Sequence, residues 1–425
     1  MSRQGGAKQK IYRSLFTNKT LMFLWSGQTV SLIGDAFYYL AVMWLVYNQS
    51  KSVFLSALVG VFFHLSSAIL SPFAGVLADR FDRKKMIITT HILSAIAVFV
   101  VSIIYFYLGY LPIAIAFITI VILNGLSTFL YPAETSILPD ILGKESLSGA
   151  YGVFQTIAQS ASLIGNAIAG FAIATIGTGW ALSLDGLSFI IVAIFITLAK
   201  IPKRKNTSIN SVVGKRHSII HDLIDGWRYI KGLPVIRSLV WLTLVINIPS
   251  FIGSLFPPLV DLQLHSGPEV LGFLKVVGII GGMVGGFVAS IFERRLGAGR
   301  LMGFFWGLAG LCTIGMGIST SVPLTMVFVL ARTWFLTVAS VCLFAIEMAI
   351  IEENYRGRVN GIRRSFAVIA IPISTLIAGG LGEVLDISIL FAVSGIPTLS
   401  VGILALINRH VRNAKVEGTP EQLEA

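Results

Sequence analysis

The sequence predicts an all-α integral membrane protein with twelve transmembrane helices. Of its 425 residues, 55% are hydrophobic and only 12% carry a formal charge. A soluble protein of this size carries about twice that fraction of charged residues. Two further observations support this fold class: the lengths of the apolar runs, and the distribution of Lys and Arg between them.

Twelve apolar runs are each close to or above the roughly 20 residues that a helix needs to cross the hydrocarbon layer. The first six lie at 20–47, 53–78, 87–109, 111–138, 147–176 and 179–199. The other six lie at 235–260, 269–291, 300–319, 322–349, 359–382 and 387–408. We therefore expect two sets of six spans.

The basic residues test this count. If both termini are cytoplasmic, 29 of the 32 Lys and Arg residues fall in cytoplasmic tails and loops. Only Lys51 lies outside, and Lys275 and Arg332 lie within helices. Because Lys and Arg accumulate on the cytoplasmic side of membrane proteins, this asymmetry predicts twelve helices with both ends of the chain in the cytoplasm.

The predicted organisation has five parts. They are a cytoplasmic N-tail (1–19), an N-terminal six-helix bundle (20–199), a cytoplasmic linker (200–234), a C-terminal six-helix bundle (235–408) and a cytoplasmic C-tail (409–425). In the linker, SIIHDLIDGWRYIK (218–231) has apolar residues at helical spacing, which predicts an amphipathic helix on the inner leaflet. Similar stretches starting at Glu134 and Glu347 indicate two parallel repeats.

The gap between the second and third runs, GVLADRFDRKK (75–85), is unusually dense in charge. Its basic residues help to fix the topology, but that does not explain an aspartate at the very end of the second run. The stretch resembles the signature of the major facilitator superfamily between helices 2 and 3, G-x-x-x-D-R-x-G-R-K/R-K/R. The matching residues are Gly75, Asp79, Arg80, Arg83, Lys84 and Lys85, and Asp82 stands where glycine is commonest.

This resemblance extends over essentially the whole chain and implies a transporter built from two six-helix repeats. In the family, the aspartate is held against the start of helix 11 when the inside is closed. A helix N-terminus carries roughly half a positive charge, so Asp79 would act as a conformational latch. By resemblance, Arg83 would reach Asp140 at the inner end of helix 4.

Ionisable residues inside the membrane cost at least about 2.5–3.5 kcal/mol on insertion scales, so each needs a reason. Asp35 and Arg332 lie at similar depth near the midplane and could pair across the halves, either as a fixed salt bridge or as a proton-exchanging acid with its arginine. Glu134 and Glu347 occupy repeat-equivalent inner positions, which fits a gate or capping role as well as proton coupling. Asp185 looks like a recurrent acid of the macrolide-efflux-like branch and is a lesser candidate for the proton site.

A second motif concerns the direction of transport. GNAIAG (165–170) resembles the antiporter signature G-P-x-x-G-G through Gly165, Asn166 and Gly170. Asn166 replaces the proline and Ala169 replaces a glycine. Because that signature accompanies exporters in the family, the resemblance implies export.

The sequence lacks the motifs that are typical of several other function classes. The chain has no G-x-x-x-x-G-K-[ST] loop for ATP, no nucleophile elbow, and no zinc or paired-cysteine spacing. We therefore expect no enzyme, no cofactor and no metal site. A net charge of +12 would suggest nucleic acid in a soluble protein, but here the basic residues follow the membrane topology, and no nucleic-acid partner is expected.

The sequence thus predicts a multi-pass secondary transporter of a bacterial plasma membrane. We expect proton-coupled export of amphipathic organic compounds, drug-like or macrolide-like, by alternating access. One alternative is a proton symporter for a sugar or other metabolite, and an alternative from another class is an integral membrane enzyme. The expected partners are the small amphipathic substrate, protons and the lipid bilayer, and the chain is expected to be a monomer.

Overall fold

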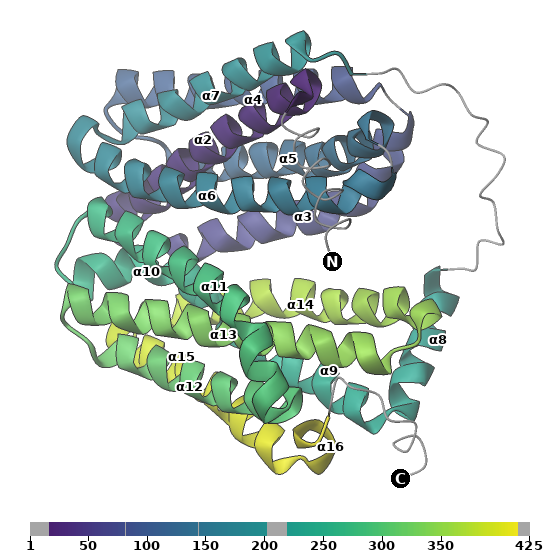
Figure 1. The fold of residues 1–425 in the computed structure, drawn as a ribbon. Coiled ribbons are helices and arrows are strands. Elements are labelled where there is room, and N and C mark those ends of the chain that lie inside the picture. The colour runs from purple at the N-terminus through teal and green to yellow at the C-terminus, as the bar shows by residue number, and fades with distance from the viewer. Residues whose placement is uncertain (1–16, 81, 143, 202–218, 415–425) are drawn as a thin grey trace. The chain divides into compact units, whose positions relative to one another are not determined.

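The computed structural model describes residues 17–80, 82–142, 144–201 and 219–414, and some side chains within these ranges lie outside the description. Throughout these ranges the chain is helical, with short connections and no strand (Figure 1). Each of the twelve predicted runs coincides with a helical segment, so the predicted fold class is confirmed.

The first six runs form one helix each. Their bounds are α2 (Lys19–Ser50), α3 (Val53–Arg80), α4 (Arg83–Leu108), α5 (Ile113–Ile141), α6 (Lys144–Ile176) and α7 (Thr178–Leu198). Local chemistry sets several of the ends. The Asn18 side chain accepts hydrogen bonds from the first N–H groups of α2, and Gly109 ends α4 in the left-handed conformation with φ of 75°.

A linker helix and six further segments follow. The helices are α8 (Ile219–Gly232), α9 (Pro234–Ile246), α10 (Phe256–Pro258), α11 (Pro268–Leu296), α12 (Ala298–Ile318), α13 (Val322–Ile350), α14 (Glu353–Leu381), α15 (Ile387–Ile407) and α16 (Arg409–Arg412). The seventh predicted run is composite, because a 3-10 segment η2 (Ile248–Leu255) and a π segment η3 (Leu259–Gln263) interrupt it around α10. Three prolines, Pro249, Pro257 and Pro258, remove backbone donors there and prevent a continuous α-helix.

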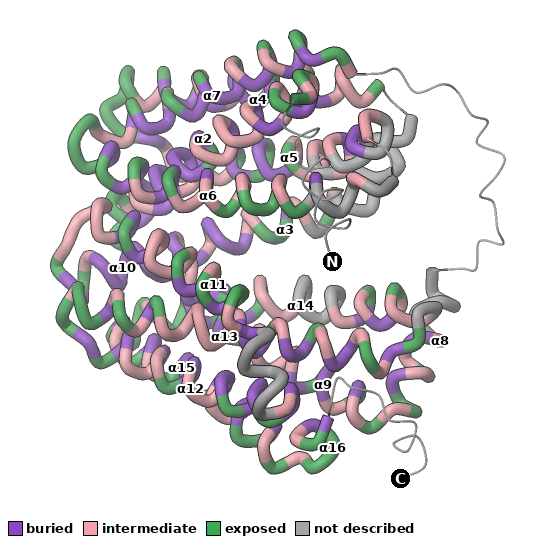
Figure 2. The backbone as a smooth tube through the Cα atoms, viewed as in Figure 1, coloured by how far each residue is buried: buried purple, intermediate pink, exposed green. Residues whose placement is uncertain are grey.

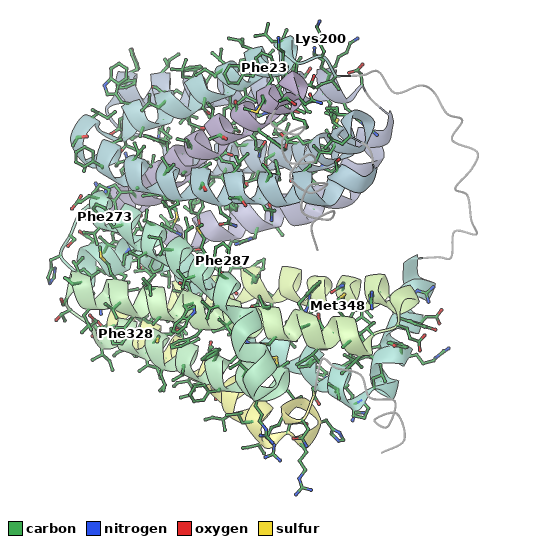
Figure 3. The ribbon with its side chains drawn as sticks, viewed as in Figure 1. Phe23, Lys200, Phe273, Phe287, Phe328 and Met348 are labelled. Carbon is green, nitrogen blue, oxygen red and sulfur yellow. The ribbon has the colours of Figure 1, made fainter. Side chains whose placement is uncertain are left out.

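The described helices have the dimensions and surfaces of membrane spans. Nine of them, and the composite segment Pro234–Gln263, are long and apolar enough to cross a membrane, and α3 and α14 contain shorter apolar stretches, Val53–Ser67 and Ala370–Leu381. Buried, intermediate and exposed residues are interspersed along the described parts of the helices (Figure 2). Large apolar side chains are exposed, among them Phe273 and Phe287 of α11 (Figure 3). Such surfaces suit a lipid environment and would aggregate in water.

The chain divides into two compact units. Unit 1 comprises Met1–Lys51, Phe62–Ile209 and Gly267–Phe273, and unit 2 comprises Ser52–Val61, Asn210–Ser266 and Leu274–Ala425. Within unit 1, α2 packs along α7 and α6, and α4 packs along α7. Within unit 2, α12 packs along α15 and α13. Two helices, α3 and α11, therefore begin in one unit and continue in the other.

The linker helix α8 belongs to unit 2. Ile230 is fully buried in the hydrophobic core of that unit, and the ring of Tyr229 stacks on Tyr355 of α14 with centroids 4.1 Å apart. The backbone N–H of Glu352 donates to the Tyr229 hydroxyl at 3.1 Å. Protein contacts therefore hold the end of α8, and the predicted place of this helix on the inner leaflet stays a prediction.

Candidate functional site

A cavity of about 130 Å³ lies among the helices of unit 1. Its walls carry one carboxylate, four aromatic rings and several small polar groups, namely Ser31, Asp35, Tyr38, Tyr39, Phe63, Ser94, Leu123, Asn124, Ser127, Leu130 and Phe189. Asp35 is the charged residue among these lining side chains, and its side chain is exposed to the cavity space. Since drug-sized sites are about 300–1,000 Å³, this space fits a charged headgroup and not a whole drug.

A second acid lies next to this cavity. Asp185 of α7 is fully buried, and its Oδ1 accepts a long 3.4 Å hydrogen bond from Ser188 Oγ. Its Oδ2 has no hydrogen-bond partner in the described part of the chain. Asp185 interacts electrostatically with Asp35 and with the buried Tyr38. A shared proton would remove the repulsion between two such carboxylates.

A glycine allows Asp185 to approach α2. A Cβ atom on Gly34 would clash with Ser188 Oγ and would lie 2.7 Å from Asp185 Oδ1. Gly34 directly precedes Asp35, so the missing side chain lets α7 place its acid against the turn of α2 that carries the first acid. The position of Asp185 therefore depends on helix packing.

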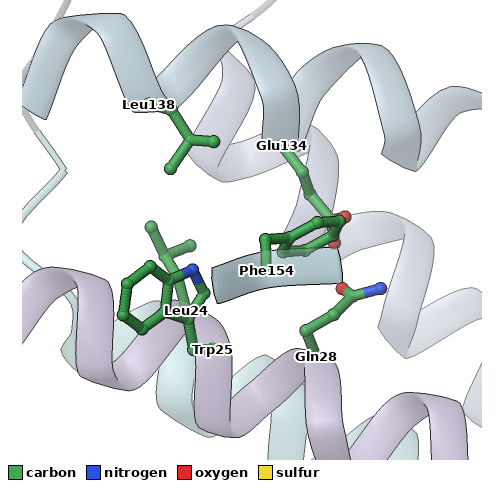
Figure 4. A pocket seen from close by; sticks show the side chains of 6 residues that line it. All are labelled: Leu24, Trp25, Gln28, Glu134, Leu138 and Phe154. Atoms are coloured by element: carbon green, nitrogen blue, oxygen red, sulfur yellow. The ribbon is translucent and has the colours of Figure 1, made fainter. Parts of the chain in front are cut away.

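Glu134 of α5 occupies a separate small pocket of about 20 Å³ between α2, α5 and α6, lined by Leu24, Trp25, Gln28, Glu134, Leu138 and Phe154 (Figure 4). With its amide nitrogen turned toward the carboxylate, Gln28 donates to both oxygens of Glu134 at 2.9 and 3.1 Å. The pocket has room for about one water molecule. Glu134 therefore has a neutral partner and no space for a substrate beside it.

In unit 2 the candidate charged residues have local partners. Glu347, only 2% exposed, accepts hydrogen bonds from Arg363 Nη1 at 2.7 and 2.6 Å, which joins α13 to α14. Arg332 Nε donates to Thr313 Oγ1 of α12 at 3.0 Å. The pairing of Arg332 with Asp35 stays a prediction.

Part of the GVLADRFDRKK motif is described. Asp82, which replaces the usual glycine, is the N-cap of α4 and accepts a hydrogen bond from the Lys85 N–H at 3.0 Å. Lys84 Nζ donates to the carbonyl oxygens of Thr197 and Ala199, both at 2.8 Å, and so caps the end of α7. These two residues hold the start of α4 in place.

The latch predicted for this motif lies largely outside the described residues. Gly75, Asp79 and Arg80 belong to α3 and Asp140 belongs to α5, but the side chains of Asp79, Arg80 and Asp140 lie outside the described residues. The latch of Asp79 and the contact of Arg83 with Asp140 stay predictions.

The antiporter-like motif in α6 consists of close-packing positions. A Cβ on Gly165 would lie 3.0 Å from Cα of Ile33 in α2, and a Cβ on Gly170 would lie 2.8 Å from Cα of Gly272 in α11. The Asn166 amide donates to the carbonyl oxygen of Ser162 at 2.7 Å. The two glycines bring α6 close to two other helices.

The structure thus joins Asp35 and Asp185, which the sequence predicted separately. Glu134 lies in its own pocket but also interacts electrostatically with Asp35, whereas Glu347 is paired with Arg363. It adds Ser188, whose role the sequence analysis missed, and it places Tyr38 beside Asp185 and Gln28 beside Glu134. One signal was present for Ser188, because it stands three residues after Asp185 and so one helical turn away.

Comparison with known proteins agrees with this architecture. The chain is 24% identical over 411 residues to macrolide efflux protein A of Streptococcus pyogenes, covering 93% of this chain and 98% of that protein. It is 23% identical over 421 residues to the multidrug efflux pump Tap of Mycolicibacterium fortuitum, covering 94% and 98% of the two chains.

Solved structures share the fold. The nucleoside transporter NupG matches with a TM-score of 0.73 and 10% identity, over 92% of this chain and 99% of NupG. A bacterial homologue of the human lysosomal transporter Spinster matches with a TM-score of 0.67 and 16% identity, over 94% and 98% of the two chains. The Major Facilitator Superfamily matches residues 24–351 and, in a second match, residues 250–424. On this evidence from sequence and fold, the chain belongs to the Major Facilitator Superfamily and is a multi-pass transporter of the plasma membrane.

Proposed function

We propose that this transporter exports amphipathic organic compounds in exchange for protons, by alternating access. The observation that carries the proposal is the cavity of unit 1, where Asp35 is the charged group and Tyr38, Tyr39, Phe63 and Phe189 supply aromatic rings. A carboxylate surrounded by aromatic faces suits an organic ammonium group, because both attract a cation.

Competition at Asp35 would couple the two fluxes. A substrate cation and a proton each neutralise the same carboxylate, so the binding of one weakens the binding of the other. Asp185 would assist as a second proton acceptor, because a buried carboxyl without a cationic partner is tolerated best in its neutral form. Glu134 would assist in proton transfer from its own pocket, and the predicted latch at Asp79 would close the inner side.

The relatives support export. Their names describe macrolide efflux and multidrug efflux, and both are covered almost end to end by this chain. A macrolide and a cationic dye are therefore the first substrates to test.

The test is transport by the purified protein in liposomes with an imposed pH gradient. We expect a fluorescent cationic dye or a macrolide to move against the proton flux. Movement with the proton flux would favour the symporter. If neither compound moves under a gradient of either sign, the proposal loses its support.

The decisive variant is Asp35→Asn. It should lower gradient-driven transport by about tenfold or more, which corresponds to about 1.4 kcal/mol, while exchange of substrate between the two sides continues. Ser127→Ala is the matched control, because it changes another lining residue without removing a charge. If Asp35→Asn still accumulates substrate against its gradient, the coupling proton binds elsewhere.

A further inference from the structure

The first turn of α3 is capped by a residue from a loop that is distant in the sequence. Ser52 Oγ donates to Glu383 Oε1 at 2.6 Å, and the backbone N–H of Phe54 donates to the same oxygen at 2.7 Å. Glu383 lies in the loop after α14, 329 residues further along the chain than Phe54. The first N–H groups of a helix have no partner within the helix and carry partial positive charge, so this carboxylate supplies both a hydrogen-bond acceptor and a counter-charge.

Ser52 completes the cap. Its hydroxyl oxygen accepts a hydrogen bond from the Leu55 N–H at 3.1 Å while it donates to Glu383. In an ordinary capping box, the Glu comes from the same helix, three residues after the cap. Here the corresponding carboxylate comes from the loop after α14, so the cap also joins α3 to a distant part of the chain.

The packing below the cap is equally close. The hydroxyl of Ser56, a fully buried residue, donates to the carbonyl oxygen of Ser254 in η2 at 2.9 Å. A Cβ on Gly379 of α14 would lie 2.6 Å from the Ala57 Cβ. Val53 is 4% exposed and lies against Gly382. The first nine residues of α3 are therefore held in unit 2, although α3 continues in unit 1 from Phe62.

We propose that Glu383 is a latch that holds the start of α3 on unit 2 in one conformation of the transport cycle and releases it in the other. This inference rests on alternating access as the proposed mechanism. A helix that belongs to both units must bend or leave one of them when the units move. Charge-assisted hydrogen bonds to a helix end are directional, so they are either formed or broken during such a movement.

Glu383 is the acid that caps α3, and the neighbouring ionisable groups make other contacts. Asp386, in the same loop, is exposed and makes no capping hydrogen bond to α15. Lys51 donates to Asn48 Oδ1 at 3.1 Å and lies over the ring of Tyr47. The segment η2 contributes no ionisable side chain. Removal of the Glu383 charge should therefore act on the cap and leave these neighbours in place.

The experiment measures access to the latch without needing a substrate. In the full-length protein, with both native cysteines replaced, Val53→Cys places a thiol under the cap. We expect Glu383→Gln to raise the rate at which a water-soluble maleimide modifies this thiol, by about five- to tenfold, the effect of losing a helix cap on an equilibrium. Asp386→Asn, which removes an acid from the same loop, should leave the rate unchanged.

The outcomes separate the latch from the proposed function. An unchanged rate in Glu383→Gln, or an equal rise in Asp386→Asn, overturns the latch. Faster modification in Glu383→Gln alone supports the latch, even if no test compound is transported in liposomes. Gel filtration and the melting temperature of each variant show whether it remains folded, and Glu383→Asp, which keeps the charge, should recover part of the protection.

Discussion

At the scale of single residues, the two acids of unit 1 differ in their access to water. Asp35 reaches the cavity, whereas Asp185 is enclosed and has one long hydrogen bond. Burial of an unpaired ionised carboxylate is expensive, so a proton on Asp185 is the natural compensation. The pair would then share one proton between Asp35, which can exchange protons with the cavity, and Asp185, which cannot.

The close approach of α7 to Gly34 can be tested by substitution. Gly34→Ala should destabilise the protein by about 1–3 kcal/mol, because the new methyl group overlaps Ser188 and presses on Asp185. Ser188→Ala in the same chain should recover part of the loss, since it removes the clashing hydroxyl oxygen. Thermal unfolding in detergent measures both effects.

Gly152→Ala in α6 is the control for that change. A Cβ at Gly152 meets nothing within 4 Å, so this substitution should be neutral or stabilising by up to about 1 kcal/mol. If Gly34→Ala behaves like Gly152→Ala, the helices can separate easily, and Gly34 does not position the acid.

At the scale of elements, one ion pair joins α13 to α14. Glu347 is 2% exposed and depends on Arg363 for its compensating charge. Glu347 could take part in proton coupling only if this pair opens. Its present geometry favours a fixed role near the inner end of unit 2.

A double-mutant cycle measures that pair. Arg363→Gln should cost about 3–5 kcal/mol of unfolding free energy, because it leaves a buried carboxylate without its partner. Adding Glu347→Gln should recover much of this loss, so the two changes will be far from additive. Additive losses in urea unfolding would mean that the contact contributes little. The control is Arg356, an arginine at the same helix junction that donates to the carbonyl oxygens of Met348 and Ile351 and not to Glu347 in these contacts.

The helical elements were predictable from the sequence, and the contacts between them were not. The length of an apolar run reflects the thickness of the bilayer, so each predicted run lies on a helical segment to within a few residues. The break in the seventh run had a signal in Pro249, Pro257 and Pro258, which the apolar count ignores. The approach of Asp185 to Gly34 depends on how α2 and α7 are rotated, and Glu383 reaches α3 across 329 residues. Neither contact produces a pattern that can be recognised in a single sequence.

At the scale of the whole molecule, the latch formed by Glu383 should be insensitive to ordinary changes in pH. Hydrogen bonds from the Phe54 N–H and the Ser52 hydroxyl hold the pKa of Glu383 below its usual value. Because its pKa is depressed, the Glu383 carboxylate stabilises the latched form fully above the ordinary pKa of a glutamate, about 4.3. This stabilisation is lost as the pH falls through the depressed pKa of Glu383. The latch would therefore stay closed by charge throughout the neutral range.

This expectation can be checked with a nitroxide label on Val384→Cys, next to Glu383 and 85% exposed. Its mobility should be constant from about pH 8 to pH 5 and should rise only below about pH 4.3. In Glu383→Gln the label should be mobile at every pH. A transition above pH 5 in the unsubstituted latch would show that the carboxylate is destabilised there and would contradict the assignment.

The docking of α8 on α14 also decides where the chain can be divided. Since Ile230 belongs to the core of unit 2 and Tyr229 packs against it, the covalent tether between the two sets of spans is the stretch between Ile201 and α8 and not the whole stretch to 234. Two fragments that meet within this tether keep α8 with the helices that it covers. Two fragments that meet at Leu233 would give α8 to the wrong partner and expose the apolar surface beneath it. A division of the chain before α8 is therefore the one that suits co-expressed halves.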